Sequence, residues 1–396
     1  MSMKNYRKGK NMKTLINNVK IITPDETLNG FALIIESGKI LSIIDARQIK
    51  LEEYNNIING KGYYLSPGFI DIHNHGNSGF DIMDSTREAL DKIGEYHISK
   101  GVTSYLGTVI TSSNEDMVKA IENMITYENS NIRSSLIGIH LEGPYFNLDK
   151  KGAQPEKHIK TPNMEELIGI LNLAGDKLKM VSLAPELEGA LEMVTYLKEN
   201  DIVVSMAHSN ATYDETKAGI EKGISIATHL YNGMREFNHR EPGIIGASLT
   251  DDRIYCEIIY DRFHLHDGAV EIALKMKGYD KIILVSDAMM AAGLDDGEYI
   301  LGGQKVIVKD DKPRLESGSI AGSTLNLQRA IYNMVNYMGV SIKDGVKMAS
   351  LNPAKAINMD GEIGSIEIGK NADLVLFDDD INIKEVYIQG SLAWKE

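Results

Sequence analysis

The chain has 396 residues, of which 43% are hydrophobic and 25% are charged, as is typical of a soluble globular protein. Its net charge of −14 argues against broad nucleic-acid binding and against association with an anionic membrane surface. No apolar run approaches the roughly 20 residues that a membrane-spanning helix needs. The single cysteine, Cys256, excludes an intrachain disulfide and fits the reducing cytoplasm, where we expect the protein to reside.

The two ends of the chain share one pattern. Residues 14–66 contain short apolar runs separated by Asn, Gly and Pro-Asp turn signals, which predict a small β unit. The C-terminal stretch returns to this alternation, with strands predicted over 364–369 and 372–377. Because chain termini often lie close together, we expect residues 12–66 and 356–396 to form one small β-sandwich domain.

Between these segments, residues 67–355 alternate apolar, β-branched runs with amphipathic, charge-rich stretches. Strands are predicted over 69–73, 102–109, 135–142, 179–184, 202–207, 224–229, 253–259 and 281–287. The stretches between them predict helices over 88–99, 114–127, 164–173, 187–199, 213–222 and 268–276. Eight buried strands alternating with helices indicate the α/β class and a (β/α)8 TIM barrel over these residues.

After the eighth strand, residues 323–338 and 343–349 also have a helical pattern. Asn352-Pro353 is a suitable N-cap and first-turn pair for one more helix.

Metal-binding side chains fall where these strands end. The first strand runs into His73-Asn74-His75, and the two-residue period of a strand places both histidines on one face. This pair alone is weak, because such pairs are common and each histidine could bond locally or face water. Four other strands end in residues of the same kind, which are Glu142, His208, His229 and Asp287.

Active sites of barrels form at the C-terminal ends of the strands, so these six side chains predict a divalent metal site. Imidazole and carboxylate ligands suit Zn²⁺ or Fe²⁺. Taken singly, Glu142 could form a buried ion pair and Asp287 could cap a helix, but the neighbouring histidines favour the metal site.

The sequence resembles a known family. Pro-Gly-Phe-Ile-Asp-Ile-His-x-His-Gly at 67–76 is similar to the first-strand signature of the amidohydrolase superfamily. Within it, the chain resembles the family of N-acetylglucosamine-6-phosphate deacetylases at 140–144, 207–213, 228–234, 240–243, 285–289, 321–324 and 369–375. The resemblance implies hydrolysis of the N-acetyl amide of N-acetyl-D-glucosamine 6-phosphate to D-glucosamine 6-phosphate and acetate, in amino-sugar catabolism.

The resemblance also implies roles for single residues. Glu142, His208 and His229 would hold the principal metal ion. His73 and His75, with Glu142 bridging and Asp287 nearby, would hold a second ion, so one or two ions are expected per subunit. Asp287 would act as the general base and then as the general acid.

The implied substrate contacts are Ala153, Gln154, Asn232, Gly233, Arg240, His264, Ile320, Ala321 and Gly322. Arg240 and His264 would bind the phosphate, with Arg240 reaching across from a second subunit of a homodimer. The residues alone favour a surface ion pair for Arg240 and an ordinary loop position for His264. Gln154 stands where some relatives have histidine, and its amide can donate a hydrogen bond but cannot titrate.

Two alternatives remain open. The substrate could be the epimer N-acetylgalactosamine 6-phosphate or that of another amidohydrolase, because epimers differ by one hydroxyl group. The barrel could instead be a non-catalytic scaffold, although such proteins usually lose metal ligands and all six candidates are present here.

Overall fold

The computed structural model describes residues 13–130 and 132–396, so residue 12 of the predicted first domain lies outside the described part. The barrel sheet has the order β17-β16-β15-β14-β13-β12-β11-β8, with every neighbouring pair parallel. Its strands are β8 (Phe69–Asp71), β11 (Val102–Ile110), β12 (Ser135–Glu142), β13 (Leu178–Leu183), β14 (Val203–Met206), β15 (Ile224–Ala227), β16 (Tyr255–Ile258) and β17 (Ile282–Leu284). Each of the eight predicted strands is confirmed.

Contacts just beyond the last and first strands close the barrel. The Asp287 N–H donates to the His73 carbonyl at 2.9 Å, and Asn74 forms a parallel bridge with Ala288. Below them, the Ser286 hydroxyl donates to the buried Asp71 carboxylate at 2.6 Å. The predicted (β/α)8 barrel is therefore confirmed, and its closure lies beside the first pair of histidines.

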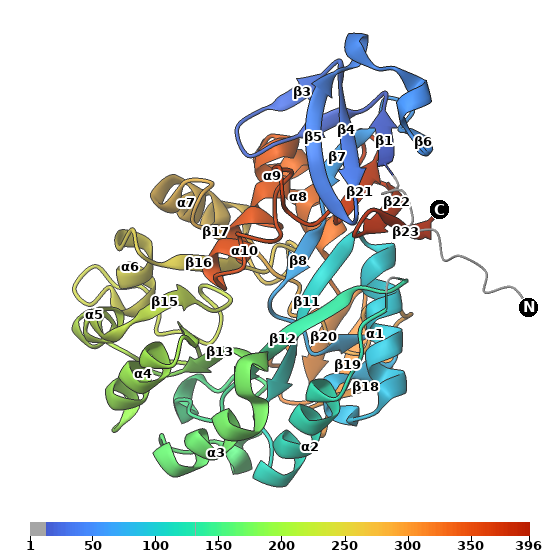
Figure 1. Ribbon diagram of the computed structural model, residues 1–396. Helices are drawn as coiled ribbons and strands as arrows, with labels where there is room; N and C mark the ends of the chain where they lie inside the picture. Colours follow the sequence, from blue (N-terminus) through green and yellow to red (C-terminus); the bar gives the residue numbers. More distant parts are fainter. Residues whose placement is uncertain (1–12, 131) are drawn as a thin grey trace, which may run out of the picture.

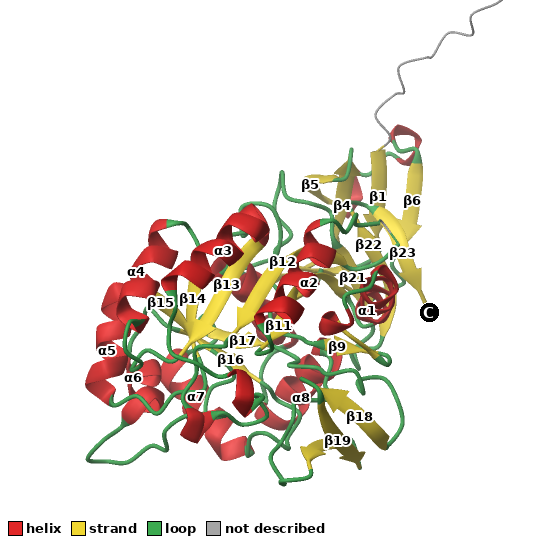
Figure 2. Ribbon diagram, turned by 90° about the horizontal axis from the view of Figure 1, so that it is seen from below, coloured by secondary structure: helices red, strands yellow, loops and turns green. Residues whose placement is uncertain are grey.

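Helices surround the barrel strands (Figure 2). They are α1 (Arg87–Ser99), α2 (Asn114–Ile125), α3 (Met164–Ala174), α4 (Ala190–Glu199), α5 (Tyr213–Lys222), α6 (Gly243–Thr250), α7 (Asp267–Lys277), α8 (Leu327–Met338), α9 (Ile342–Met348) and α10 (Leu351–Ala356). Side chains that accept a backbone N–H cap many of their N-termini, such as Thr86, Ser113 and Ser341. None of the helices in the described ranges is both long and apolar enough to cross a bilayer.

Two helices differ from the sequence predictions by more than their exact bounds. Helix α6 was not predicted, because residues from Gly243 to Leu249 are all buried and no polar stripe marks an exposed face. The predicted cap at Asn352 is wrong, since α10 already begins at Leu351. The Asn352 amide instead donates to the carbonyls of Tyr279 and Ile282, each at 2.7 Å.

The terminal segments build two further sheets beside the barrel (Figure 1). One has the order β5-β4-β1-β6, formed by Lys39–Asp45, Phe31–Glu36, Lys13–Asn17 and Asn56–Asn59. The other has the order β23-β22-β21-β7-β2-β3, formed by Ser391–Lys395, Ile383–Ile388, Leu374–Phe377, Tyr64–Pro67, Lys20–Ile22 and Thr27–Asn29.

The C-terminal strand β21 pairs antiparallel with the N-terminal strand β7. Apolar side chains of the two sheets, such as Ile16 and Leu33 from one and Leu65 and Leu374 from the other, share a core. The predicted β-sandwich of both termini is confirmed, whereas the domain boundaries at 66/67 and 355/356 stay a prediction.

The strand predicted over 364–369 is wrong. Gly364 has φ +90° and Gly369 has φ +91°, so left-handed residues stand at both ends of this segment and it forms turns. A Cβ on Gly364 would lie 2.6 Å from the Ala354 Cβ, so the segment passes close against α10. The prediction of a strand over 372–377 is confirmed by β21.

A small antiparallel sheet after β17 was not predicted. It consists of β18 (Gly297–Leu301), β19 (Gln304–Lys309) and β20 (Lys312–Leu315), and Figure 2 shows β18 and β19 well apart from the sandwich strands. The sequence does carry a signal for it, since Gly302-Gly303 is a two-residue hairpin turn between alternating residues. Its inner face contributes Leu301 to an apolar cluster with Ile110 and thereby brings the insertion to the barrel mouth. A shorter hairpin, β9 (Gly76–Asn77) with β10 (Phe80–Asp81), follows the first barrel strand.

Candidate metal centre and substrate pocket

The Glu142 carboxylate lies at the centre of a buried cluster of histidines. Its Oε1 is 3.5 Å from His73 Nε2 and 3.4 Å from the Nε2 atoms of both His208 and His229. Its Oε2 is 3.3 Å from His75 Nε2. The cluster thus forms two groups that could each hold an ion, with Glu142 shared between them and the ligand atoms of each group within 4.8 Å of one another.

Asp287 lies beside these two groups and is a member of neither. Its Oδ1 is 3.3 Å from His75 Nε2 and 3.6 Å from His73 Nε2. Its role as a metal ligand stays a prediction. Because the carboxylate also lines the cavity above the cluster, it can reach a bound molecule there.

The local backbone turns three of these side chains over the barrel mouth. His208, His229 and Asp287 follow their strands with φ of +45°, +31° and +47°, in the left-handed region that non-glycine residues seldom adopt. Such strained residues concentrate at functional sites. Gly233 leaves room for one of them, because a Cβ at this position would lie 2.7 Å from His208 Nδ1.

The carboxylates give the cluster a strong preference for positive charge. Burial alone would lower the pKa of His75, but its hydrogen bonds with Asp287 and Glu142 outweigh burial and raise it to about 10. Burial alone would likewise raise the pKa of Asp287, but the charge of His73 and the contact with His75 hold it at about 2. The buried His73 Nε2 has no hydrogen-bond partner among the described residues and faces two carboxylate oxygens at 3.5 and 3.6 Å. Both the donor set and the charge fit a divalent cation.

Contacts to Nδ1 orient the imidazoles of His73 and His208 so that their Nε2 atoms face Glu142. Glu257 Oε2 lies 3.1 Å from His73 Nδ1 and also accepts the His229 N–H at 3.2 Å. The Lys150 carbonyl lies 2.9 Å from His208 Nδ1. Such partners fix the tautomer of metal-binding histidines. Glu257 was not predicted, although a single acidic residue within the apolar run 254–259 is a usable signal.

His140 packs edge-on against the His73 ring, with 4.8 Å between centroids, and its Nε2 lies 2.6 Å from the Ser182 hydroxyl. Burial, followed by the charge of His73, holds the pKa of His140 well below its usual value. It therefore supports the cluster as a neutral ring.

Gln154 faces the cluster from the loop after β12. Its Nε2 donates to Glu142 Oε2 at 2.8 Å, and its Oε1 accepts the Thr111 N–H at 3.2 Å. The side chain is therefore held against the Glu142 carboxylate and also lines the cavity.

A cavity of about 210 Å³ opens above the cluster. Most of the predicted substrate-contact residues line it, namely Ala153, Gln154, Asn232, Gly233, His264, Ile320 and Gly322. Leu301 of the inserted sheet also lines it and was not predicted. Two predicted residues lie elsewhere: Ala321 is buried in the apolar cluster under the inserted sheet, and Arg240 is exposed on the loop before α6.

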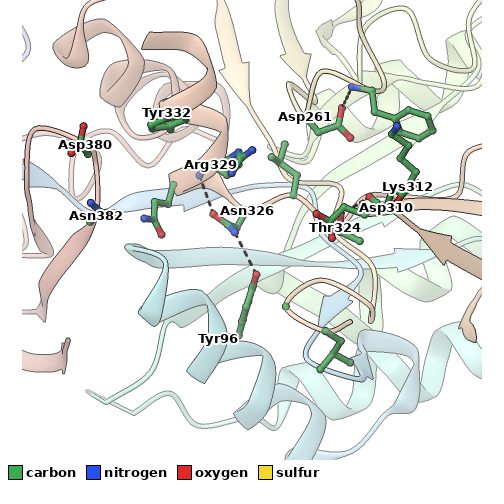
Figure 3. Close-up of a pocket in the computed structure, with 16 residues that line it drawn as sticks. Tyr96, Asp261, Asp310, Lys312, Thr324, Asn326, Arg329, Tyr332, Asp380 and Asn382 are labelled. Carbon is green, nitrogen blue, oxygen red and sulfur yellow. Dashed lines mark hydrogen bonds between the residues drawn. The ribbon is translucent and has the colours of Figure 1, made fainter. Parts of the chain in front are cut away.

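A second hollow, of about 740 Å³, lies where the N-terminus of α8, the β19–β20 turn and Tyr96 of α1 meet (Figure 3). The Asn326 side chain accepts the Arg329 N–H there at 3.0 Å and donates to the Tyr96 hydroxyl at 3.4 Å. No histidine or cysteine is among its lining residues, whereas His75, His208 and His229 line the smaller cavity.

Comparison with known proteins agrees with this arrangement. Residues 64–393 match the amidohydrolase family, and the chain belongs to that family of hydrolases. Its relatives include N-acetylgalactosamine-6-phosphate deacetylase of Escherichia coli O157:H7, which is 35% identical over 94% of this chain and 97% of that protein. N-acetylglucosamine-6-phosphate deacetylase of Lysinibacillus sphaericus is also 35% identical, over 96% of this chain and 98% of that protein.

Among solved structures, N-acetylglucosamine-6-phosphate deacetylase from Pasteurella multocida superimposes with a TM-score of 0.91. It is 33% identical, and the match covers 97% of this chain and 100% of that one. The resemblance stated from the sequence motifs is therefore confirmed.

Proposed function

We propose that the protein hydrolyses the N-acetyl amide of N-acetyl-D-glucosamine 6-phosphate, releasing D-glucosamine 6-phosphate and acetate, in the cytoplasm as part of amino-sugar catabolism. One observation carries the proposal, namely that four imidazoles and two carboxylates from five different strand ends converge under one cavity. The names of the relatives supply the substrate class.

The metal would be Zn²⁺ or Fe²⁺. Glu142, His208 and His229 would hold the principal ion, and His73 and His75 would hold a second ion through the shared Glu142. When bound there, a divalent ion supplies Lewis-acid polarisation of the acetyl carbonyl and makes water more acidic.

Asp287 would transfer the protons. Its carboxylate is ionised at neutral pH, since its pKa is about 2, burial being outweighed by the charge of His73 and the contact with His75. It can therefore accept a proton from the attacking water and then deliver it to the departing nitrogen, which leaves as an amine. This second transfer is needed because an amide nitrogen is a poor leaving group until it is protonated.

The phosphate group would be bound by His264 and by Arg240 of a second subunit. His264 lines the cavity, whereas Arg240 is exposed and has no carboxylate within ion-pair distance in the described ranges. The homodimer, in which each subunit would supply its Arg240 to the other, rests on the family resemblance, and the exposed position of Arg240 leaves it accessible to a second subunit. A guanidinium suits phosphate because it offers paired donors.

Acetate release from N-acetylglucosamine 6-phosphate, its galacto epimer and the unphosphorylated sugar tests the proposal directly. We expect strong preference for a phosphorylated sugar, and equal turnover of the free sugar would contradict the phosphate roles. Asp287→Asn should keep the fold and the metal content and lose turnover by at least about a hundredfold, as removal of a general acid–base commonly does. Near-normal turnover by this variant would refute the role of Asp287.

The galacto epimer remains the second candidate, because the E. coli relative named for it is as similar, at 35%, as the one named for the gluco substrate. A non-catalytic scaffold is the remote alternative. A purified protein without transition metal, and without activity after addition of Zn²⁺ or Fe²⁺, would favour the scaffold.

A further inference from the structure

Asp261 and His264 form a mostly buried acid–imidazole pair outside the candidate metal centre, and His264 lines the substrate cavity. Asp261 Oδ2 lies 2.7 Å from His264 Nδ1, and the two side chains are only 16% and 4% exposed. His264 lines the substrate cavity, whereas Asp261 lines the larger hollow, in which Figure 3 labels it. Asp261 is not among the residues that line the substrate cavity, so His264 alone of this pair meets that cavity.

Asp261 also shapes the loop that carries His264. Its Oδ1 accepts the backbone N–H groups of Phe263 and His264, each at 2.8 Å. This is possible because Arg262, with φ +66°, turns the chain back toward the carboxylate. All three bonds use the carboxylate as an acceptor.

The protonation of this pair follows from the same contacts. Burial alone would raise the pKa of Asp261, but the hydrogen bond and charge of His264 more than offset burial, and the net pKa is lowered. An ionised carboxylate can only accept hydrogen bonds, so His264 Nδ1 carries a proton. The other ring nitrogen, Nε2, is left for the substrate pocket.

Contacts independent of Asp261 hold the remainder of the loop. The Tyr260 hydroxyl donates to Asp267 at 2.9 Å, and the Arg262 guanidinium lies 3.7 Å from the centroid of the Tyr337 ring. The buried Asn333 amide donates to the Tyr260 carbonyl at 2.8 Å. A change confined to the charge of Asp261 should therefore leave the loop folded.

We propose that Asp261 is a positioning residue that makes His264 a cationic anchor for the phosphate of the substrate, an inference that rests on the proposed function. With Nδ1–H committed to Asp261, the ring can donate to a second anion only as an imidazolium. Asp261 thereby sets the preference of the pocket for a phosphate dianion over a neutral sugar hydroxyl, through a charge-assisted bond from Nε2.

Asp261→Asn tests this inference in the full-length, metal-loaded protein. The amide oxygen can still accept both backbone N–H groups, while the amide nitrogen donates to Nδ1 and leaves His264 neutral with its proton on Nε2. Replacing a charge-assisted bond with a neutral one should raise KM for the phosphorylated sugar about tenfold. We expect kcat, and kcat/KM for the unphosphorylated sugar, to change less than about twofold, and inhibition by inorganic phosphate to weaken in parallel with KM.

Asp267→Asn is the matched control, because Asp267 supports the same loop through Tyr260 and Arg262 without bonding to His264. The inference is overturned if Asp267→Asn raises KM as much as Asp261→Asn, or if Asp261→Asn impairs both sugars equally. It is also overturned if Asp261→Asn adds its full effect in a His264→Gln background, where the pair no longer exists.

Failure of the proposed function would look different, because the unaltered protein would then not distinguish phosphorylated from free sugar. If Asp261→Asn does not fold, Asp261→Ser removes the charge and keeps a hydroxyl acceptor for the backbone, and the same comparison applies to it.

Discussion

Replacing Gln154 with leucine tests whether this side chain holds the central carboxylate in place. Gln154 is only 3% exposed, and the orientation of its amide is fixed by chemistry. The Thr111 N–H can only donate, so the atom it meets is the amide oxygen, and the amide nitrogen must face Glu142 Oε2. Leucine has a similar size and can make neither bond.

The magnitude follows from what is lost. A buried hydrogen bond to a charged group contributes about 1.5–3 kcal/mol, and about 2 kcal/mol corresponds to roughly a thirtyfold change in an equilibrium constant. The loss of an outer partner of a metal ligand typically weakens metal binding about 10–100-fold, which agrees with this value. We therefore expect the Gln154→Leu protein to bind metal about thirtyfold more weakly than the unaltered protein.

Competition with a chromophoric chelator measures this affinity, and metal content by mass spectrometry gives the stoichiometry. Gln304→Leu is the matched control, because the Gln304 amide donates to the Ala153 carbonyl at 2.6 Å and supports the same loop without touching Glu142. Unchanged metal affinity in Gln154→Leu would refute the reasoning. An equal loss in Gln304→Leu would assign the effect to the loop and not to the bond with Glu142.

Two further predictions concern the histidines. Joint replacement of His73 and His75 by glutamine and asparagine should lower the metal content from about two ions to about one per chain, because Glu142, His208 and His229 form a complete group without them. Loss of all metal in this variant, measured by mass spectrometry, would contradict the two-group arrangement. Burial lowers the pKa of the His97 imidazole to about 3, from 6.5 in the unfolded chain. Between these two pH values, His97 therefore binds a proton in the unfolded state but not in the folded state. Folding stability should therefore fall below pH 6.5, by about 2 kcal/mol at pH 5. Urea unfolding at pH 6.5 and at about pH 5 measures this loss of stability, which should be correspondingly smaller in His97→Gln than in the unaltered protein. An identical loss in the two proteins would show that other groups cause it.

The barrel could be predicted from the sequence because each of its strands is a local, continuous apolar run. Segments without such a local signal could not be predicted in the same way. Helix α6 is buried on every side and has no period that distinguishes it, and residues 364–369 alternate like a strand although Gly364 and Gly369 hold left-handed conformations. The inserted sheet at 297–315 has a local signal in the sequence, the hairpin turn at Gly302-Gly303.

The candidate metal centre could be predicted for a related reason. The carboxyl ends of parallel strands meet at one end of a barrel, so residues at these ends converge even when they are far apart in sequence. No comparable rule predicts which residues contact and orient the histidines of the site. Glu257 reaches His73 across the barrel interior, and Asp261 reaches His264 only because Arg262 turns the chain back. The first contact depends on three-dimensional placement that no spacing in the sequence encodes, and the second depends on a positive φ at the non-glycine residue Arg262.

The residues of the candidate metal centre do not by themselves identify the substrate. The reacting amide would lie over strand-end residues such as Glu142, whereas the sugar and its phosphate would meet loop residues such as Asn232, His264 and Ile320. Two relatives that are each 35% identical to this chain are named for epimeric substrates, so overall similarity does not separate the epimers. A metal ion held by the strand-end residues would act on the acetyl group, which is the same in both epimers. We therefore predict that the loop residues lining the cavity select between the gluco and galacto substrates. Substitutions of these residues should alter the ratio of kcat/KM for the two epimers while metal content stays constant.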